Sequence, residues 1–336
     1  MRIAVFGAGS IGAYVGGALL AAGADVVLIG RARMRARIAA HGLTLSDLHG
    51  HKVTLAAADV PYVEDNAALA DAELVLVTVK SADTAAAAQA IRAHARPDVL
   101  VLSLQNGVGN AAVLREHLPG ARVLAGMVPF NVVQMADGRL HRGTAGELMV
   151  EASPLVAPWL AVFAAAHLPL IEQNDFDAVQ WGKLLVNLNN SVNALCGIPL
   201  KAELSQRAYR RCLALLIDEG RQVLKAAGIR PAKVIRVGPA LLPTLLRLPD
   251  AIFARVAAAM LRIDPEARSS MWEDLQAGRA TEVHYLNGAI VRLAAQVGTT
   301  APVNARMVAM ITEAEAGAPP ALSGPEMLRL LSAARA

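Results

Sequence analysis

The first half of the chain alternates between short apolar runs and segments whose apolar residues recur at helical spacing. The apolar runs predict buried strands at residues 2–6, 26–29, 53–57, 74–79 and 99–104. The helically spaced segments predict helices at residues 11–23, 31–40 and 83–95. Strands that alternate with helices of this length predict a parallel, doubly wound α/β sheet covered by helices on both faces.

The pattern changes after about residue 122, where Asp137-Gly138 forms a turn signal between β-compatible segments and predicts an antiparallel extension. Beyond Gln173 the strand signals fade and helical spacing dominates. The predicted helices are residues 176–195, 205–227, 251–261, 280–297 and 304–314. We therefore predict two domains, a Rossmann-type α/β domain over residues 1–173 and an all-α domain over residues 174–336.

The composition excludes several classes of protein. With 55% hydrophobic and 18% charged residues in 336, the chain is not intrinsically disordered. Aromatic residues make up only 4%, and the net charge of +4 is scattered, so we expect no nucleic acid partner but a small anionic ligand. Two cysteines and eight histidines without ligand spacing predict neither a disulfide framework nor a metal site.

The first 24 residues could also be interpreted as a signal peptide, because a single positive charge precedes an apolar run with a small-residue end. The glycines in that run would weaken a signal-peptide helix, and a β-rich run follows Asp25. A strand, a glycine turn, a helix and a second strand account for the whole segment. No later apolar run reaches about 20 residues, so we expect a soluble, cytoplasmic protein with no membrane partner.

A G-x-G-x-x-G motif closes the first predicted strand and opens the first predicted helix. It consists of Gly7, Ala8, Gly9, Ser10, Ile11 and Gly12. In this context the spacing predicts a dinucleotide site: Gly7 permits a tight turn, Gly9 lets the backbone approach a pyrophosphate, and Gly12 lets the helix pack closely. The alternative is a glycine-rich turn that binds no ligand.

The end of the second strand indicates which dinucleotide binds. An NAD site would place an acidic residue there, whereas this chain has Gly30-Arg31, and Asp25 stands at the opposite end of the strand. Because a guanidinium suits a 2′-phosphate, we predict NADPH/NADP as the cofactor. Lys80 and Asn106 follow two other predicted strands, at the edge of the sheet where ligands bind. The alternatives are a solvated lysine and an Asn-Gly turn.

The predicted helix at residues 176–195 carries a polar stripe. At helical spacing Lys183, Asn187, Asn190 and Ser191 share a face within a leucine-rich segment. Because asparagine is a poor helix former, we favour a stripe that lines a polar cleft over a solvated face. Downstream, Ser270 is predicted to be an N-cap with Glu273 as its capping-box partner, and Glu282 could be a surface carboxylate.

At these residues the sequence resembles the ketopantoate reductase (2-dehydropantoate 2-reductase) family. Besides the fingerprint, Arg31 and Lys80, the motifs that carry the resemblance are Gln105-Asn106-Gly107-Val108-Gly109, Trp181-Gly182-Lys183-Leu184, Ser269-Ser270-Met271 with Asp274, and Thr281-Glu282 with Tyr285 and Asn287-Gly288. The resemblance implies NADPH-dependent reduction of a 2-keto acid, bound with the cofactor between the two domains. The role implied is catalytic acid for Lys183 and its carboxylate partner for Glu282.

The resemblance further implies that Asn106, Asn187 and Ser270 bind the substrate or organise its site, with support from Asp274. Ser191 stands where typical members place an asparagine, eight residues after the lysine, so the pocket could be shaped for another keto acid. Two alternatives stay open: a β-hydroxyacid dehydrogenase, and a nonenzymatic NADP(H)-sensing protein that needs no Lys183–Glu282 pair. A homodimer built through the helical half is also expected.

Overall fold

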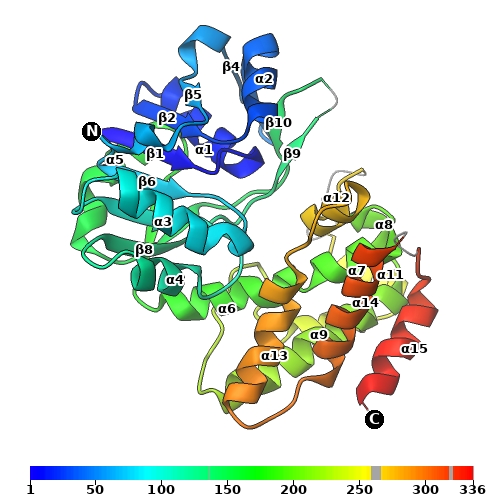
Figure 1. Cartoon of the computed structure of the whole chain (residues 1–336). Helices are drawn as coiled ribbons and strands as arrows, with labels where there is room; N and C mark the ends of the chain where they lie inside the picture. The colour runs from blue at the N-terminus through cyan, green and yellow to red at the C-terminus, as the bar shows by residue number, and fades with distance from the viewer. Residues whose placement is uncertain (136, 259–265, 318–320, 336) are drawn as a thin grey trace. The chain divides into compact units, whose positions relative to one another are not determined.

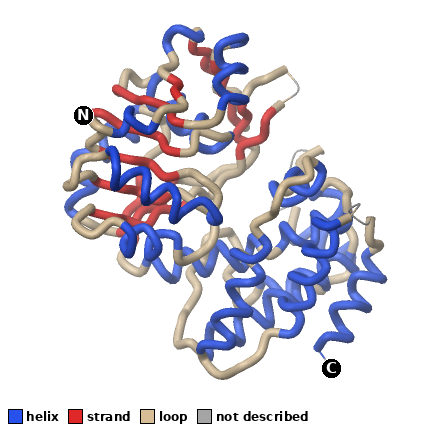
Figure 2. Tube along the Cα trace, in the orientation of Figure 1, coloured by secondary structure: helices blue, strands red, loops and turns tan. Residues whose placement is uncertain are grey.

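The computed structural model describes residues 1–135, 137–258, 266–317 and 321–335. The chain forms two compact units, Met1–Phe176 and Asp177–Ala336. Figure 2 shows that the strands belong to the first unit and that the described part of the second unit is helical. The fold class predicted from the sequence, a doubly wound α/β unit followed by an all-α unit, is confirmed.

An eight-stranded sheet forms the centre of the first unit, in the order β12-β11-β8-β7-β6-β1-β2-β5. Its strands are β1 (Arg2–Phe6), β2 (Asp25–Ile29), β5 (Tyr62–Val63), β6 (Leu74–Val77), β7 (Leu100–Ser103), β8 (Arg122–Met127), β11 (Leu148–Glu151) and β12 (Leu170–Gln173). Neighbouring strands are parallel except β8 and β11. The chain runs outward from β1 in one direction and from β6 in the other, so the strand order reverses between these two strands.

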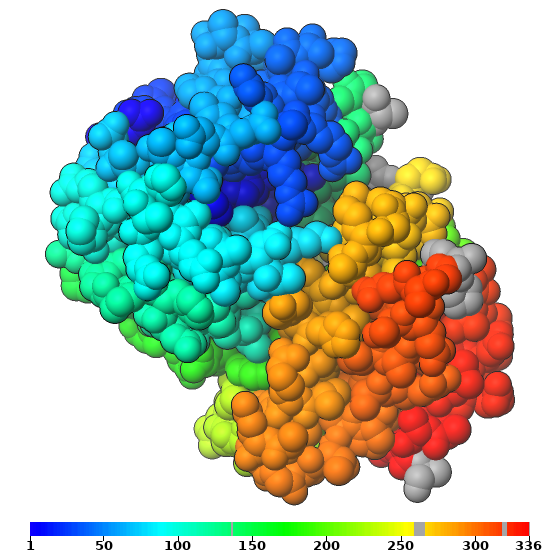
Figure 3. Space-filling view, viewed as in Figure 1, coloured from blue at the N-terminus to red at the C-terminus, as the bar shows by residue number. Residues whose placement is uncertain are grey.

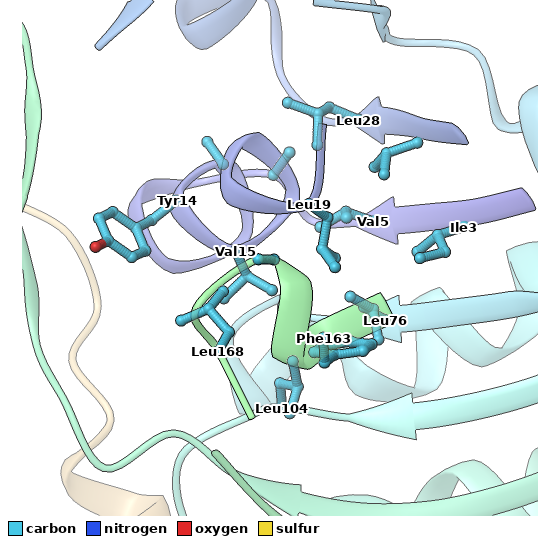
Figure 4. Close-up of a cluster of buried hydrophobic side chains, with 14 of the residues drawn as sticks. Ile3, Val5, Tyr14, Val15, Leu19, Leu28, Leu76, Leu104, Phe163 and Leu168 are labelled. Atoms are coloured by element: carbon cyan, nitrogen blue, oxygen red, sulfur yellow. The ribbon is translucent and has the colours of Figure 1, made fainter. Parts of the chain in front are cut away.

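Helices cover both faces of this sheet. α1 (Ser10–Ala21) contacts α5 (Ala157–Ala165) on one face, whereas α3 (Thr84–His94) and α4 (Asn110–His117) lie side by side on the other (Figure 1). Figure 4 shows Val15 and Leu19 of α1 turned toward β1, with Phe163 of α5 nearby. This double cover explains why the strands are apolar throughout rather than alternating.

A separate four-stranded sheet, in the order β4-β3-β10-β9, corrects part of the prediction. Its strands are β3 (Leu43–Asp47), β4 (Lys52–Leu55), β9 (Val132–Gln134) and β10 (Leu140–Arg142). The predicted turn at Asp137-Gly138 joins the antiparallel pair β9 and β10, and Gly138 has φ +94°. The run at residues 53–57 is wrong as a strand of the parallel sheet, because β4 pairs antiparallel with β3 and keeps one face exposed.

The second unit consists of helices packed around α9. They are α6 (Phe176–Asn187), α7 (Asn189–Cys196), α8 (Leu200–Leu204), α9 (Arg207–Ala226), α10 (Leu242–Leu246), α11 (Asp250–Val256), α12 (Ser270–Gln276), α13 (Asn287–Gln296), α14 (Pro302–Ala316) and α15 (Gly324–Arg335). α9 contacts α7, α10, α13, α14 and α15. It is the longest of these helices, and its buried residues recur at helical spacing.

Two predicted helices are divided. The segment 176–195 is interrupted at Leu188, and the segment 280–297 becomes α-helical only at Asn287. Residues 259–261 of a third predicted helix lie outside the described residues. The remaining short elements are α2 (Ala32–His41) and the 3-10 turns η1 (Ala57–Asp59), η2 (Asn66–Leu69), η3 (Ser81–Asp83), η4 (Pro154–Val156) and η5 (Val283–Tyr285).

Within residues 1–135, 137–258, 266–317 and 321–335, no helix combines the length and the hydropathy needed to cross a bilayer. Over the same ranges, no group of three or more histidine, cysteine or acidic side chains is arranged to hold a metal ion.

Candidate functional site

The glycine motif forms the turn between β1 and α1 in the first unit. Gly7 has φ +94°, and a Cβ built there would lie 2.6 Å from the backbone nitrogen of Val79. At Gly12 a Cβ would lie 2.4 Å from Thr78 Oγ1, which donates a hydrogen bond to the Gly7 carbonyl oxygen at 2.9 Å. The turn therefore packs directly on the segment after β6, and neither position has room for a side chain, because the Val79 backbone blocks Gly7 and the Thr78 side chain blocks Gly12.

The middle glycine of the motif faces open space instead. A Cβ built on Gly9 would meet only the Gly7 carbonyl oxygen, at 3.9 Å, although Gly9 is the N-cap of α1. The first N–H groups of a helix have no acceptor within the helix and favour a negative charge. The turn thus has the space and the donors that a pyrophosphate requires. In Figure 3 some of the dark blue atoms, from the N-terminal part of the chain, lie in a hollow bordered by lighter blue and cyan atoms of the same unit.

Tyr62 holds this turn in place, and no sequence pattern identifies it as part of the site. Its hydroxyl donates to the Ala8 carbonyl oxygen at 3.1 Å and lies 3.4 Å from the Arg31 carbonyl oxygen. Burial raises the pKa of Tyr62 to about 12, so the phenol remains a donor at neutral pH. Tyr62 lies in β5, a strand of two residues that is too short to produce a recognisable pattern.

Arg31 stands at the carboxyl end of β2, as the N-cap of α2. Its guanidinium forms an ion pair with Asp83 at 3.2 Å, and its side chain is 87% exposed. Asp25 begins β2 at the opposite end, so it cannot replace the acidic residue of an NAD site. The charge at this end of the strand is a cation that solvent can reach.

Lys80 and Asn106 follow the neighbouring strands β6 and β7, and a buried network fixes the loops that carry them. The Asn110 amide donates to the Asn106 carbonyl oxygen at 2.7 Å and to Ser81 Oγ at 3.1 Å. Thr84 Oγ1 donates to the Ser81 carbonyl oxygen at 2.8 Å. The loop after β6 is thereby tied to the loop after β7, with the Asn106 side chain exposed.

Gln105 completes this network. It is buried, and its amide donates to Thr84 Oγ1 at 2.7 Å and to the Val79 carbonyl oxygen at 3.2 Å. Buried polar groups are costly unless they are hydrogen-bonded, and both bonds that the Gln105 amide donates run from the end of β7 to the segment after β6. Gln105 directly follows an apolar run and stands in one of the motifs that carry the resemblance, whereas Thr84 lies several residues beyond its strand and has no such local signal.

In the second unit, α6 presents Lys183 and, one turn later, Asn187. Both side chains are partly exposed, while Leu184 and Leu185 beside them are buried. Burial lowers the pKa of Lys183 to about 8, because the charged ammonium is poorly solvated there. An amine with this pKa is protonated at neutral pH and can release its proton without a large free-energy cost.

The polar stripe continues past the interruption at Leu188 with little change of direction. Leu188 keeps right-handed helical dihedrals, φ −58° and ψ −19°. Ser191 is fully buried, and its hydroxyl donates to the Leu188 carbonyl oxygen at 2.9 Å. This side-chain bond competes with the regular helical ladder and accompanies the break. The Ser191 hydroxyl therefore faces the helix backbone, whereas Lys183, Asn187 and Asn190 remain partly exposed.

Gly182, directly before the lysine, allows another segment to pack against α6. A Cβ there would lie 2.3 Å from the Ala232 carbonyl oxygen, and the Ala232 N–H donates to the Ala178 carbonyl oxygen at 2.7 Å. The backbone after α9 thus lies directly against the turn that carries Lys183. This contact gives the glycine of the Trp-Gly-Lys motif a packing role.

The predicted N-cap of α12 is wrong by one residue. Ser269 caps the helix by accepting from the Trp272 N–H at 3.1 Å, and Ser270 is the first helical residue and exposed. Ser269 also donates to the Asn190 carbonyl oxygen at 3.2 Å, which places it at the cap position. Glu273 is consequently not the capping-box partner of Ser270, and the Ser270 hydroxyl is not used as a cap.

Asp274 and Glu282 lie near the two ends of the segment that follows. Asp274 is buried on α12 and forms an ion pair with Arg279 at 3.0 Å. Glu282 is partly exposed and precedes η5, where its carbonyl oxygen accepts from the Tyr285 N–H at 2.9 Å. The sequence predicted a helix over residues 280–297, with Glu282 in its first turn. In the structure Glu282 instead lies in the turn before η5, and α13 begins at Asn287.

Comparison with known proteins assigns both units. Residues 3–154 match the family "Ketopantoate reductase PanE/ApbA", and residues 175–315 match "Ketopantoate reductase PanE/ApbA C terminal". A 2-dehydropantoate 2-reductase of Halobacterium salinarum is 31% identical over 310 residues, which are 90% of this chain and 95% of that protein.

Solved structures agree with this assignment. A PanE/ApbA family ketopantoate reductase from Ralstonia eutropha JMP134 superposes with a TM-score of 0.79 at 30% identity, covering 94% of this chain and 99% of that one. D-mandelate dehydrogenase in a ternary structure with NADH and anilino(oxo)acetate superposes with a TM-score of 0.75 over 94% of this chain and 99% of that one. At 20% identity the latter shows a shared fold only.

Proposed function

We propose that this chain, which belongs to the ketopantoate reductase family and is thus an NADPH-dependent oxidoreductase, reduces 2-dehydropantoate to pantoate for pantothenate biosynthesis. The observation that carries the proposal is Lys183. It is an amine on α6 whose pKa burial lowers to about 8, with Asn187 one turn away. A 2-keto acid needs such a group, because its carbonyl oxygen must gain a proton when the carbonyl is reduced.

We assign cofactor binding to the first unit. The residues proposed to hold the cofactor are Gly7, Ala8, Gly9, Ser10, Ile11, Gly12, Arg31, Lys80 and Asn106. The open space at Gly9 and the first-turn N–H groups of α1 would accept the pyrophosphate, and Arg31 would bind the 2′-phosphate. When bound, NADPH supplies the hydride for the reaction.

We assign the proton transfer to Lys183. Its ammonium stabilises the negative charge that develops on the C2 oxygen of the substrate and donates the proton that forms the hydroxyl. Desolvation lowers the pKa of the Lys183 amine, and we propose that the Glu282 carboxylate favours the charged form of that amine. A lysine that is partly neutral near pH 8 can also accept the proton in the reverse direction.

The substrate is held by polar side chains from several elements. We propose that the Ser270 hydroxyl, exposed at the start of α12, binds the substrate carboxylate, and that Asn106 and Asn187 bind its other oxygens. Asp274 supports this segment through its ion pair with Arg279. These contacts would orient the carbonyl for reaction and would lower the entropic part of the barrier.

A second candidate substrate is a different 2-keto acid, and the observation that favours it is Ser191. This residue takes the place of the asparagine that typical members have, and its hydroxyl is already bonded to Leu188 within the helix. We propose that Ser191 shapes the substrate pocket by its small size rather than by a direct polar contact. A side chain smaller than asparagine leaves room for a bulkier substituent on the substrate.

The test is a substrate panel assayed by loss of NADPH absorbance. The panel contains 2-dehydropantoate, an aliphatic 2-keto acid, phenylglyoxylate and a 3-keto acid, each with NADPH and with NADH. The highest kcat/KM with 2-dehydropantoate supports the proposed reaction, and the highest value with phenylglyoxylate favours the second candidate. Turnover of the 3-keto acid alone, or of no keto acid although NADPH binds, contradicts both.

A further inference from the structure

A buried polar network in the second unit joins α7, α8 and the segment before α12, and Asn193 is its centre. Asn193 is fully buried. Its amide donates to Glu203 Oε2 at 2.7 Å and to the Ile198 carbonyl oxygen at 2.9 Å. Its Oδ1 accepts the backbone N–H of Ser269 at 2.8 Å. A single side chain on α7 therefore connects the loop after that helix, α8, and a segment 76 residues away in sequence.

The bond to Ser269 fixes the backbone directly before Ser270. The same short segment is held by a bond from the Leu200 N–H to the Ala267 carbonyl oxygen at 2.9 Å and by the bond from Ser269 to α7. Ser270 itself is exposed. The backbone that carries the Ser270 hydroxyl is thus held in place largely by the buried residues Asn193 and Ser269.

Glu203 supports Asn193 from the side opposite Ser269. It is fully buried, and burial raises its pKa to about 8. Among the described residues, Glu203 Oε1 and Asn189 Oδ1 are buried acceptors with no hydrogen bond, although the Asn189 side chain lies close enough to affect the pKa of the carboxyl. A proton on the carboxyl converts one of these two acceptors into a donor, so the neutral acid suits the network better than the carboxylate.

The groups around Glu203 offer no compensating charge. The titratable side chains that face it are the thiols of Cys196 and Cys212 and the phenol of Tyr209. Arg210 is buried on the same helix as Cys212, but its guanidinium is paired with Asp250 at 2.9 Å and with backbone carbonyl oxygens. In the part of the chain that the structure describes, no cation pairs with Glu203.

We propose that Asn193 and Glu203 are positioning residues for Ser270, and that they hold the start of α12 in its substrate-binding position while Glu203 is neutral. The inference rests on the proposed function, because it takes Ser270 as the residue that binds the substrate carboxylate. Asn193 acts through the backbone of Ser269 and does not touch the substrate. Ionisation of Glu203 weakens the network and with it the position of Ser270.

The first test is a double-mutant cycle in the full-length enzyme, with Asn193→Ala, Ser270→Ala and the double variant. Each single variant is expected to raise KM for the 2-keto acid about tenfold, which corresponds to one lost hydrogen bond to a charged group. The double variant is expected to match Ser270→Ala, because Asn193 acts through that residue. The Kd for NADPH is expected to be the same in wild type and in all three variants, and this control shows that the variants are folded. Asn193→Ser serves if the alanine variant does not fold.

The second test is Glu203→Gln, which keeps the shape of the neutral acid. Below about pH 8 its KM is expected to equal that of wild type, and above that pH the KM of wild type rises while that of the variant stays flat. An acid whose pKa is raised by folding loses stability as pH rises. The Tm of wild type should therefore fall relative to Glu203→Gln from roughly pH 5 to pH 8.

The outcomes separate the two hypotheses. If wild type reduces a 2-keto acid but the effects of Asn193→Ala and Ser270→Ala multiply, the positioning role is overturned and the proposed function stands. A raised KM for Glu203→Gln at pH 7 has the same meaning, because it shows that the carboxylate is required. If wild type reduces no 2-keto acid, the proposed function fails and the positioning role fails with it.

Discussion

The glycine turn of the first unit and the polar stripe of the second place functional groups in different ways. In the turn the backbone itself makes the site: Gly7 takes a φ that other residues avoid, and Gly9 leaves space beside the first turn of α1. In the stripe, Lys183 and Asn187 are side chains on a helix, and packing with distant segments decides how far each is buried.

The two ways of placing functional groups suit two different tasks, which are binding of the cofactor and transfer of a proton. Backbone N–H groups and glycine turns cannot change their charge, so they suit a cofactor whose phosphates are always anionic. A proton donor must change its charge, and its pKa depends on desolvation by neighbouring side chains. The first unit should therefore tolerate changes of pH that the second does not, and variants should divide in the same way.

Replacing Lys183 gives the largest expected effect. Lys183→Ala should lower kcat by roughly 10²–10⁴-fold, because the general acid is removed. NADPH binding, measured by fluorescence titration, should stay near the wild-type value. The matched control is Lys201→Ala, an exposed lysine on α8 of the same unit, which should leave kcat unchanged. Wild-type turnover in Lys183→Ala would refute the assignment of the acid.

The pH dependence of turnover sharpens the comparison further. Because the pKa of Lys183 is about 8, kcat for reduction should fall about tenfold per pH unit above that value, as the amine loses its proton. Oxidation of the 2-hydroxy acid needs the neutral amine, so its rate should rise through the same pH. The Kd for NADPH should remain flat from roughly pH 7 to pH 9, because guanidinium and backbone donors do not titrate there. If the rates of reduction and of oxidation both fall, or both rise, as the pH increases through about 8, this assignment of the proton donor is contradicted.

Replacing Arg31 tests the one proposed cofactor contact in the first unit that distinguishes NADPH from NADH through a side chain rather than through the backbone. Arg31→Ala should lower kcat/KM for NADPH by roughly 10–100-fold, because bonds to a charged group contribute about 1.5–3 kcal/mol. The value for NADH, which has no 2′-phosphate, should change little. Arg35→Ala is the control, because Arg35 lies on α2, the helix that Arg31 precedes, and its guanidinium pairs with Glu64 at 3.1 Å. Equal losses with both cofactors would assign Arg31 a structural role.

How much the sequence could predict follows the same division. The fingerprint, Arg31 and the strand ends are local features, and the fold places them at one edge of a sheet by rule. Tyr62 could not be found this way, because it contacts Ala8 across 54 residues from a strand of two residues. The break at Leu188 was missed for a similar reason, since helical periodicity continues through it and only the buried Ser191 hydroxyl marks it.

The start of α12 is the sharpest case, because two adjacent serines compete for one role. Spacing to Glu273 favours Ser270 as the cap, but Asn193 binds the Ser269 N–H from 76 residues away and Ser269 takes the position. Local pattern could not decide between them, because the deciding contact is tertiary.

Replacing these two serines gives the smallest expected effects. It is also the most direct test of the assignment of Ser269, rather than Ser270, as the N-cap of α12. Ser269→Ala should lower the free energy of unfolding by about 1 kcal/mol, because the Trp272 N–H loses its cap. Ser270→Ala should leave stability within roughly 0.5 kcal/mol, since its side chain is exposed, yet it should raise KM for the keto acid. Urea unfolding and steady-state kinetics on both variants measure the two effects separately. If Ser270→Ala is the variant that loses stability, the capping assignment is reversed, and Ser270 is then a structural residue rather than a ligand to the substrate.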